Sequence, residues 1–417
     1  MRKLSLFRFS ELWYAGYAFQ GAVVFGIGGI LMPIVVNNAG NAAKAGTVIA
    51  FFYIGQMLAP VIGSIADRKG LHRVFYLAGY VLLALGLGLF PFTSLLWFWM
   101  ALAFVQGVGS GATNTVAAML IVEFRPKDEW DRRIGWLQTF YGIGQCMGLV
   151  LVSILQSRPE LGLVVSAFLM VPGLIIGSLR LPATRVHHEP HEKVFQHRLH
   201  RPQRSVASIL TKYYATMGKS ARTLAAEWFS SYGLFILGWF FVMLATWLLG
   251  TLFPLVMKDA LNVSYRMSSI YYAIGAAIGI FAYAPSGALG KKIGDGWVVL
   301  IGILMTLVSL SCMTMLAYWD TGFNKWLVPL VYIPIPIAWS PLMVGGTAWA
   351  AQLATFEEGE ALGFFNAATA ISSVISALGA GLLGHHFGYG TVLLAGACSS
   401  AVSVVCLLPL LFKRKTA

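Results

Sequence analysis

Neutral polar and aromatic side chains, rather than charged ones, interrupt the long apolar segments of this sequence. Gln138, Tyr141 and Gln145 follow one another at spacings that place them on one face of a helix. Six more such residues lie in other apolar segments: Gln20, Gln56, Asn114, Trp247, Trp339 and Asn366. An amide facing hydrocarbon is costly, so it must bond to a neighbouring helix or line a wet cavity. The whole set favours a cavity for an uncharged or zwitterionic, partly apolar ligand, and interhelical bonding is the alternative for any one of them.

The acidic residues follow the opposite pattern. The sequence contains 16 Asp and Glu residues, and none falls in the middle third of a long apolar segment. Ionisable groups inside a membrane are costly and mark ion or proton paths. We therefore expect no proton relay through a buried carboxylate and no central arginine for a strongly anionic substrate.

Twelve membrane spans must position these residues. The chain has 417 residues, of which 58% are hydrophobic and 11% charged, and its mean hydropathy is +0.74. Soluble domains average about 25% charged residues, and about 20 apolar residues cross a bilayer. The expected spans are 12–36, 47–66, 74–93, 95–123, 134–156, 161–180, 232–257, 267–289, 297–317, 326–354, 362–384 and 391–412.

Basic residues predict the orientation of these spans. With a cytoplasmic N-terminus, only five of the 29 Lys and Arg residues fall in outer loops. Without the long central linker, fifteen still lie on the inner side. We therefore expect a multi-pass protein of the bacterial inner (plasma) membrane with both termini cytoplasmic. This pattern also explains the net charge of +13 without nucleic acid as a partner.

The spans divide into two halves that repeat each other. We expect an N-terminal six-helix bundle at 1–180, a cytoplasmic linker at 181–231 and a C-terminal bundle at 232–417. Gly55, Gly63 and Gly70 recur 224 residues later with identical spacing. A duplicated six-helix unit is the architecture of many secondary transporters.

The linker offers two further hypotheses. Apolar residues from Val206 to Met217 recur at helical spacing, which indicates an amphipathic surface helix, with a plain tether as the alternative. Five linker histidines could form a metal site, but Pro190 interrupts them and a solvated segment is the better interpretation.

A motif follows the second span, and it resembles the Major Facilitator Superfamily. That family has Gly-x-x-x-Asp-Arg/Lys-x-Gly and then basic residues in this loop. Gly63, Asp67, Arg68 and Gly70 match, and Arg73 replaces the first basic residue, since Leu71 stands in its place. The resemblance implies an all-α membrane protein of twelve transmembrane helices in two six-helix pseudo-symmetric bundles. It also implies that spans one, four, seven and ten line a cavity.

The same resemblance assigns the loop a gating role. Asp67 would face the start of span eleven, near residues 361–363, while Arg68 and Arg73 would pair with acids such as Glu123. Such contacts would hold one gate state and break in the other. The alternative is an ordinary basic loop. Two other family motifs, which are typical of proton-coupled members and drug antiporters, lack their arginine (at Ala103) and their proline.

The sequence therefore predicts a transporter of a small organic solute that works by alternating access, and not an enzyme. We expect no cofactor and no metal, a small-molecule substrate and the lipid bilayer as partners, and a monomer. The alternatives are an exporter of amphipathic, lipid-like or drug-like compounds, and an assembly or receptor protein that uses a transporter fold without flux.

Overall fold

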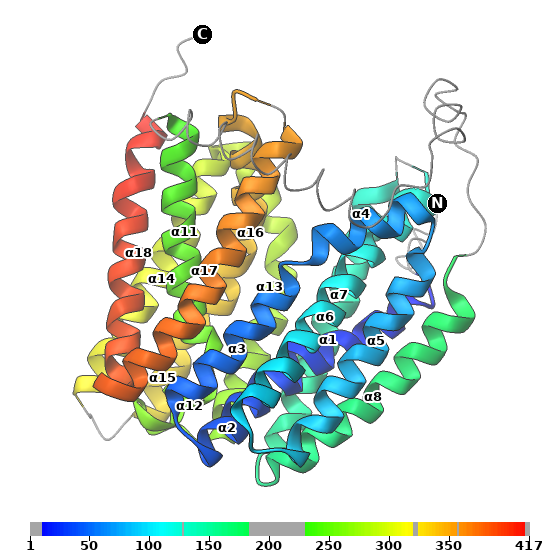
Figure 1. Cartoon of the computed structure of the whole chain (residues 1–417). Helices are drawn as coiled ribbons and strands as arrows, with labels where there is room; N and C mark the ends of the chain where they lie inside the picture. The colour runs from blue at the N-terminus through cyan, green and yellow to red at the C-terminus, as the bar shows by residue number, and fades with distance from the viewer. Residues whose placement is uncertain (1–10, 127–128, 183–229, 320–323, 357, 413–417) are drawn as a thin grey trace, which may run out of the picture.

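The computed structural model describes residues 11–126, 129–182, 230–319, 324–356 and 358–412. These residues form twelve helical stretches long and apolar enough to cross a membrane. Figure 1 shows them gathered in two bundles, and the twelve stretches confirm the predicted fold. The linker helix and the histidine cluster predicted from the sequence lie outside the described residues.

The N-terminal bundle contains the first six stretches. Its elements are α1 (Tyr14–Gly21), the π-helix η1 (Ala22–Gly28), α2 (Gly29–Ala39), α3 (Ala42–Gln56), α4 (Ala59–Lys69), α5 (His72–Leu89), the 3-10 turn η2 (Phe90–Phe92), α6 (Leu96–Phe124), α7 (Trp130–Leu155) and α8 (Pro159–Arg180). The C-terminal bundle consists of α11 (Ser231–Thr251), α12 (Phe253–Asp259), α13 (Tyr265–Ile293), α14 (Asp295–Tyr318), α15 (Asn324–Tyr332), α16 (Pro334–Leu353), α17 (Glu358–Phe387) and α18 (Tyr389–Phe412).

Proline explains the interruptions of three spans. Span two breaks between α3 and α4, with Pro60 in the first turn of α4, and span seven breaks at Leu252, just before Pro254. Span ten breaks at Ile333, just before Pro334. Proline has no backbone N–H to donate into the preceding turn, so it favours a break or kink there. It does not force one, since α2, α8 and α13 continue through Pro33, Pro172 and Pro285.

The repeated glycines occupy equivalent places in the two halves. A Cβ on Gly55 would lie 2.3 Å from a backbone oxygen of α6, and one on Gly279 would lie 2.9 Å from a backbone oxygen of α16. Gly70 and Gly294 end α4 and α13 with positive φ angles of 64° and 93°, a region that favours glycine. Spans two and eight therefore pack on spans four and ten in the same way.

The two halves touch at one end of the molecule. We name the end where α8 finishes and α11 begins the linker end, and the opposite end the far end. Toward the far end, α3 lies beside α17 (Figure 1), and a Cβ on Gly46 would lie 2.3 Å from the carbonyl oxygen of Ala377. Toward the linker end, a Cβ on Gly135 of α7 or Gly363 of α17 would meet nothing within 4 Å. The interface therefore closes at the far end and opens toward the linker end.

Candidate functional site

The polar residues of the N-terminal half meet in one hydrogen-bonded group. The side-chain oxygen of Asn114 on α6 accepts from the Tyr17 hydroxyl at 2.9 Å and from the Gln20 amide at 2.7 Å. Gln56, at the end of α3, donates to the Ser110 hydroxyl at 3.0 Å, one turn along α6. The Gln20 side-chain oxygen is buried without a hydrogen-bond partner among the described residues. Three predicted site residues therefore share one polar group, which leaves an acceptor for a ligand.

Aromatic rings from both halves form a layer beside this group. Tyr141 of α7 lies 6.4 Å from Phe25 of η1, measured between ring centroids, and Phe25 lies 6.1 Å from Trp247 of α11. Trp247 also lies 5.3 Å from Tyr53 of α3 and 5.8 Å from Trp339 of α16. We name these five residues the aromatic layer. Because they come from both halves, a solute in contact with the layer would be touched by both.

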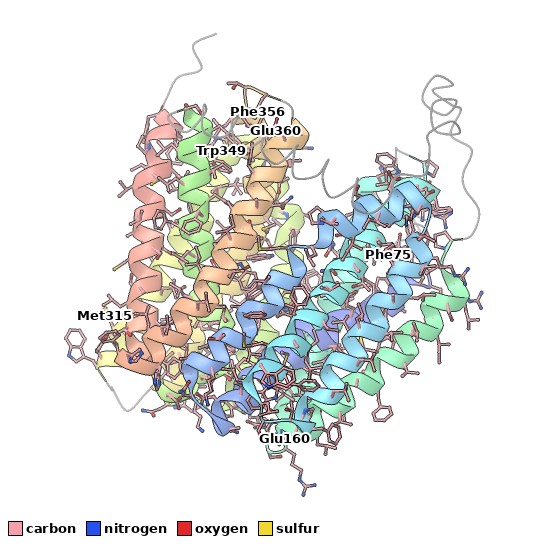
Figure 2. All side chains as sticks on the ribbon, in the orientation of Figure 1. Phe75, Glu160, Met315, Trp349, Phe356 and Glu360 are labelled. Carbon is pink, nitrogen blue, oxygen red and sulfur yellow. The ribbon has the colours of Figure 1, made fainter. Side chains whose placement is uncertain are left out.

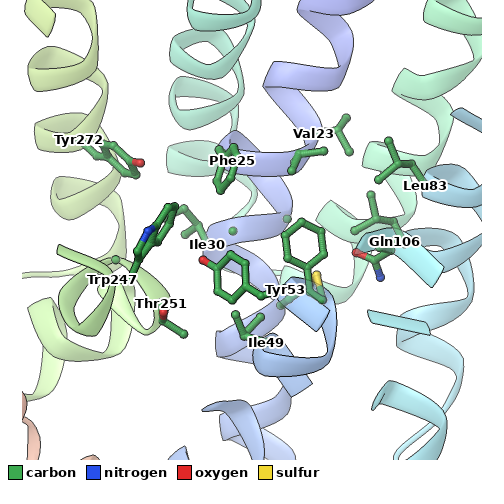
Figure 3. Close-up of a pocket in the computed structure, with 17 residues that line it drawn as sticks. Val23, Phe25, Ile30, Ile49, Tyr53, Leu83, Gln106, Trp247, Thr251 and Tyr272 are labelled. Carbon is green, nitrogen blue, oxygen red and sulfur yellow. The ribbon is translucent and has the colours of Figure 1, made fainter. Parts of the chain in front are cut away.

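A cavity lies on the far-end side of the aromatic layer. Figure 3 shows it extending from Thr251 and Tyr272 in the C-terminal half to Leu83 and Gln106 in the N-terminal half. The π-helix η1 forms one side of the cavity, between α1 and α2. Short π-helical segments are rare and frequently mark functional sites. No sequence pattern indicates this π-helix, because its residues resemble those of any apolar helix.

A short apolar segment covers the far end of the interface. Leu255, Val256 and Met257 of α12 are fully buried, and α12 packs against α2 of the other half. The backbone N–H of Val263 donates to the Met257 carbonyl at 2.9 Å and folds the segment back. We name residues 252–263 the far-end seal. At its surface, burial raises the pKa of the Asp259 carboxyl, while the neighbouring lysine lowers it.

The remaining predicted binding residues lie along the interface. Gln145 donates to the Tyr272 hydroxyl at 3.1 Å and so joins α7 to α13. Gln138 lies on the same face of α7, two turns nearer the linker end. It is exposed, and its side chain reaches the Tyr17 hydroxyl of the polar group. Asn366 of α17 is exposed as well. Gln138 and Asn366 are therefore placed along the open part of the path.

The gate loop differs from the prediction in its basic residues. Arg73 donates to the backbone carbonyl of Ser178, so its predicted pairing with Glu123 is wrong for this conformation. Asp67 is exposed, and Gly63 packs near Thr115 of α6. The side chain of Arg68 lies outside the described part of the structure. The contact of Asp67 with span eleven belongs to a closed linker end, so its gating role stays a prediction.

Glu123 has a partner that the sequence did not indicate. The Nδ1 atom of His72, the first residue of α5, lies 2.8 Å from a Glu123 carboxylate oxygen, and the His72 side chain is buried. In the sequence, His72 is not distinguishable from the other basic residues of its loop. Only the packing of α5 against α6 reveals the pair.

A second ion-pair cluster fastens the linker end of the N-terminal half. Glu11 accepts from Arg125 at 2.7 and 2.6 Å and from Arg133 at 2.7 Å, and Arg133 also bonds Glu129. The indole N–H of Trp13 donates to Glu11 at 3.0 Å. More than 100 residues separate Glu11 from its arginines, so no local pattern could predict the cluster.

Every described acidic residue inside a helix lies within three residues of that helix's end. Figure 2 shows Glu160 at the far end and Glu360 at the linker end. The polar group and the aromatic layer thus lie in a part of the path without a described carboxylate.

Comparison with known proteins places this architecture in a family. A sequence model described as Major Facilitator Superfamily matches residues 13–355, and again residues 235–417. The niacin transporter NiaP of Acinetobacter baylyi is 30% identical over 141 residues, 33% of this chain and 32% of that protein. The class C tetracycline resistance protein of Escherichia coli is 28% identical over 130 residues, 29% of this chain and 32% of that protein. These matches span about a third of each relative.

Solved structures match over nearly the whole chain. The nucleoside transporter NupG superposes with a TM-score of 0.69 at 16% identity, covering 97% of this chain and 98% of that one. The D-xylose-proton symporter gives a TM-score of 0.69 at 14% identity, with 96% of both chains covered. At such identities the likeness shows the fold alone.

Proposed function

Because this chain belongs to the Major Facilitator Superfamily, a family of small-solute transporters, we propose that it moves an uncharged or zwitterionic, partly apolar organic solute by alternating access. The observation that supports this proposal is the polar group beside an aromatic layer drawn from both halves. Aromatic walls with a few fixed hydrogen-bonding groups suit such a solute.

The asymmetry of the interface supports the mechanism. The far-end seal and the contact of α3 with α17 close one end of the path, while the other end opens toward the linker. A solute held by both halves can favour a rearrangement that closes the linker end and opens the far end. The path lies inside one chain, so a monomer suffices. By the distribution of basic residues, the linker end faces the cytoplasm.

The charges of the path support the solute class. A carboxylate or ammonium ion enclosed between aromatic rings would need a partner of opposite charge, and the polar group offers only amide and hydroxyl atoms. A zwitterion could still be held if its charges lie toward the open linker end.

Counterflow in proteoliposomes tests the proposal. Vesicles loaded with an unlabelled solute should accumulate the labelled solute faster than empty ones. Niacin, a nucleoside, xylose and tetracycline form the starting panel, because the similar proteins are named for them. Asn114→Leu should abolish the exchange, since it removes the acceptor shared by Tyr17 and Gln20.

The matched control is Asn38→Leu, which removes an exposed amide at the end of α2. It should exchange solute like the unaltered protein. Efflux of tetracycline from cells without uptake of any nutrient would instead identify the exporter, the second hypothesis from the sequence. Absence of exchange for every uncharged or zwitterionic solute in a broadened panel would contradict the proposal.

A further inference from the structure

The cavity behind the aromatic layer has walls suited to a flat ring. Phe25, Phe52, Tyr53, Trp247 and Tyr272 all line it (Figure 3), and most of its other lining residues are aliphatic or glycine. Aromatic side chains stack on flat rings, or meet them edge to face, with a preference beyond simple area burial. A flexible polar chain would gain little from such walls.

The size of the cavity limits what it can hold. Its interior volume is about 60 Å³, whereas an apolar cavity of about 150 Å³ holds benzene. A six-membered ring is therefore only partly enclosed unless lining side chains move, and a fused polycyclic body would exceed the cavity.

Unpartnered polar atoms point to the chemistry of the ring. Two buried atoms on the cavity lining have no hydrogen-bond partner among the described residues: the amide nitrogen of Gln106 and the indole nitrogen of Trp247. The Thr251 hydroxyl is also buried on the lining, beside the Tyr53 hydroxyl. Gln106 and Thr251 are each only 2% exposed. Buried polar groups without partners are rare in native proteins. Indole and amide N–H groups only donate, so a ligand that satisfies them must offer acceptor atoms.

The lining also excludes charge. Among the described residues around the cavity there is no acid, lysine, arginine or histidine. A charged group that entered would lose its hydration without gaining a counter-ion. The ring held there is therefore uncharged, even where the rest of the solute extends toward the polar group.

We propose that this cavity is a binding subsite for a flat, uncharged ring with acceptor atoms, and that Gln106, Trp247 and Thr251 recognise those acceptors. This inference rests on the proposed function, because the ring is part of the transported solute. It adds specificity residues that the polar group does not contain. Gln106 favours rings that carry an acceptor atom, and the aromatic walls favour rings that are flat.

Binding of four matched probes to the purified protein tests the subsite. Benzamide is flat, uncharged and has an acceptor. Benzoate adds a charge, cyclohexanecarboxamide loses flatness, and toluene loses the acceptor. Calorimetry should show benzamide binding at least about tenfold more tightly than each of the other three, the effect of about one good hydrogen bond or one unpaired charge.

Two variants connect the probes to the cavity. Gln106→Leu and Trp247→Phe should each weaken benzamide binding about tenfold and leave toluene binding unchanged. The melting temperature of ligand-free Gln106→Leu should not fall, because its amide nitrogen has no partner to lose. Gln156→Leu is the matched control, since its amide donates to Ser153 outside the cavity and its binding should be unchanged.

Equal binding of benzamide and benzoate, or of benzamide and cyclohexanecarboxamide, would overturn the subsite. Unchanged benzamide binding in both variants would do the same, and so would absence of binding by all four probes, the result expected if the cavity holds only water. The proposed function is judged separately by counterflow. A protein that exchanges only ringless uncharged or zwitterionic solutes would keep its proposed function and refute the subsite.

Discussion

A methyl group at Gly46 should push the transporter out of the conformation described here. Gly46 lies where α3 of one half meets α17 of the other. An added Cβ would lie 2.3 Å from the carbonyl oxygen of Ala377 and 2.7 Å from the Cα of Gly381. Both are backbone atoms, which cannot rotate away as a side chain could. Gly46→Ala therefore fits only if the far end opens.

The expected size of the effect follows from this overlap. Ordinary contacts begin near 3.4 Å, so the two helices must separate by roughly 1 Å. Overpacking a tight contact costs about 1–3 kcal/mol. That energy corresponds to a change of about 5–150-fold in the ratio of the two conformations. The glycine-to-alanine change itself favours the helix by less than this.

Electron–electron distance measurements in nanodiscs can read the shift. Spin labels at Asn38→Cys and Phe387→Cys, both exposed near the far end of opposite halves, report its opening. Gly46→Ala should enlarge the long-distance population. Gly379→Ala is the matched control on α17, because its Cβ would lie 3.6 Å from Leu248, an ordinary contact. Identical distance distributions for Gly46→Ala and the control would refute the idea that this contact holds the far end closed.

Three further predictions follow from the charged residues. Asp67→Asn should fold but transport at least about fivefold more slowly, because the closed linker end loses its carboxylate contact; unaltered flux would remove the gating role. A proton gradient should not drive uphill uptake through a mid-span acid. Uphill accumulation that is abolished by an uncoupler, and also by one mid-span substitution, would contradict this. Because burial raises the Asp259 pKa above 3.8, its contribution to stability is present below that pH and lost as pH rises through the folded-state pKa. Melting curves of Asp259→Asn recorded at several pH values should lack this small loss of stability with rising pH. A larger loss of stability in the variant would refute the assignment of the effect to Asp259.

Hydropathy was sufficient to predict the fold, because crossing a bilayer requires a long apolar helix whatever the tertiary contacts. The short connection between the expected spans 74–93 and 95–123 contains the 3-10 turn η2, where the Trp99 indole donates to the Phe90 carbonyl at 3.0 Å. The glycine repeat was equally informative, since Gly70 and Gly294 both end helices with positive φ.

The site was predictable only in part. Gln20, Gln56 and Asn114 stood out because amides are conspicuous in apolar segments, and the structure brings them together. Gln106 and Thr251 were missed, since nothing in the sequence separates a cavity wall from an interhelical contact. Aromatic residues such as Phe25 face lipid or a cavity equally well by composition.

Pairings between distant residues were the least predictable. The basic residues near span two suggested that Arg73 would reach Glu123, but helix packing directs Arg73 to the end of α8 and gives Glu123 a histidine partner. Side-chain direction on a helix end depends on the rotation of its neighbours, which one sequence does not contain.

The central claim is that one path opens at one end at a time, and thiol accessibility from the two sides tests it most directly. In a background without the four native cysteines, Gln138→Cys lies on the open linker-end part of the path, and Leu255→Cys lies buried in the far-end seal. An impermeant reagent should label Gln138→Cys from the linker side alone and Leu255→Cys from the far side alone. Gly46→Ala should raise far-side labelling and lower linker-side labelling together. Labelling of both positions from one side, or a rise in both at once, would describe a channel and contradict the account.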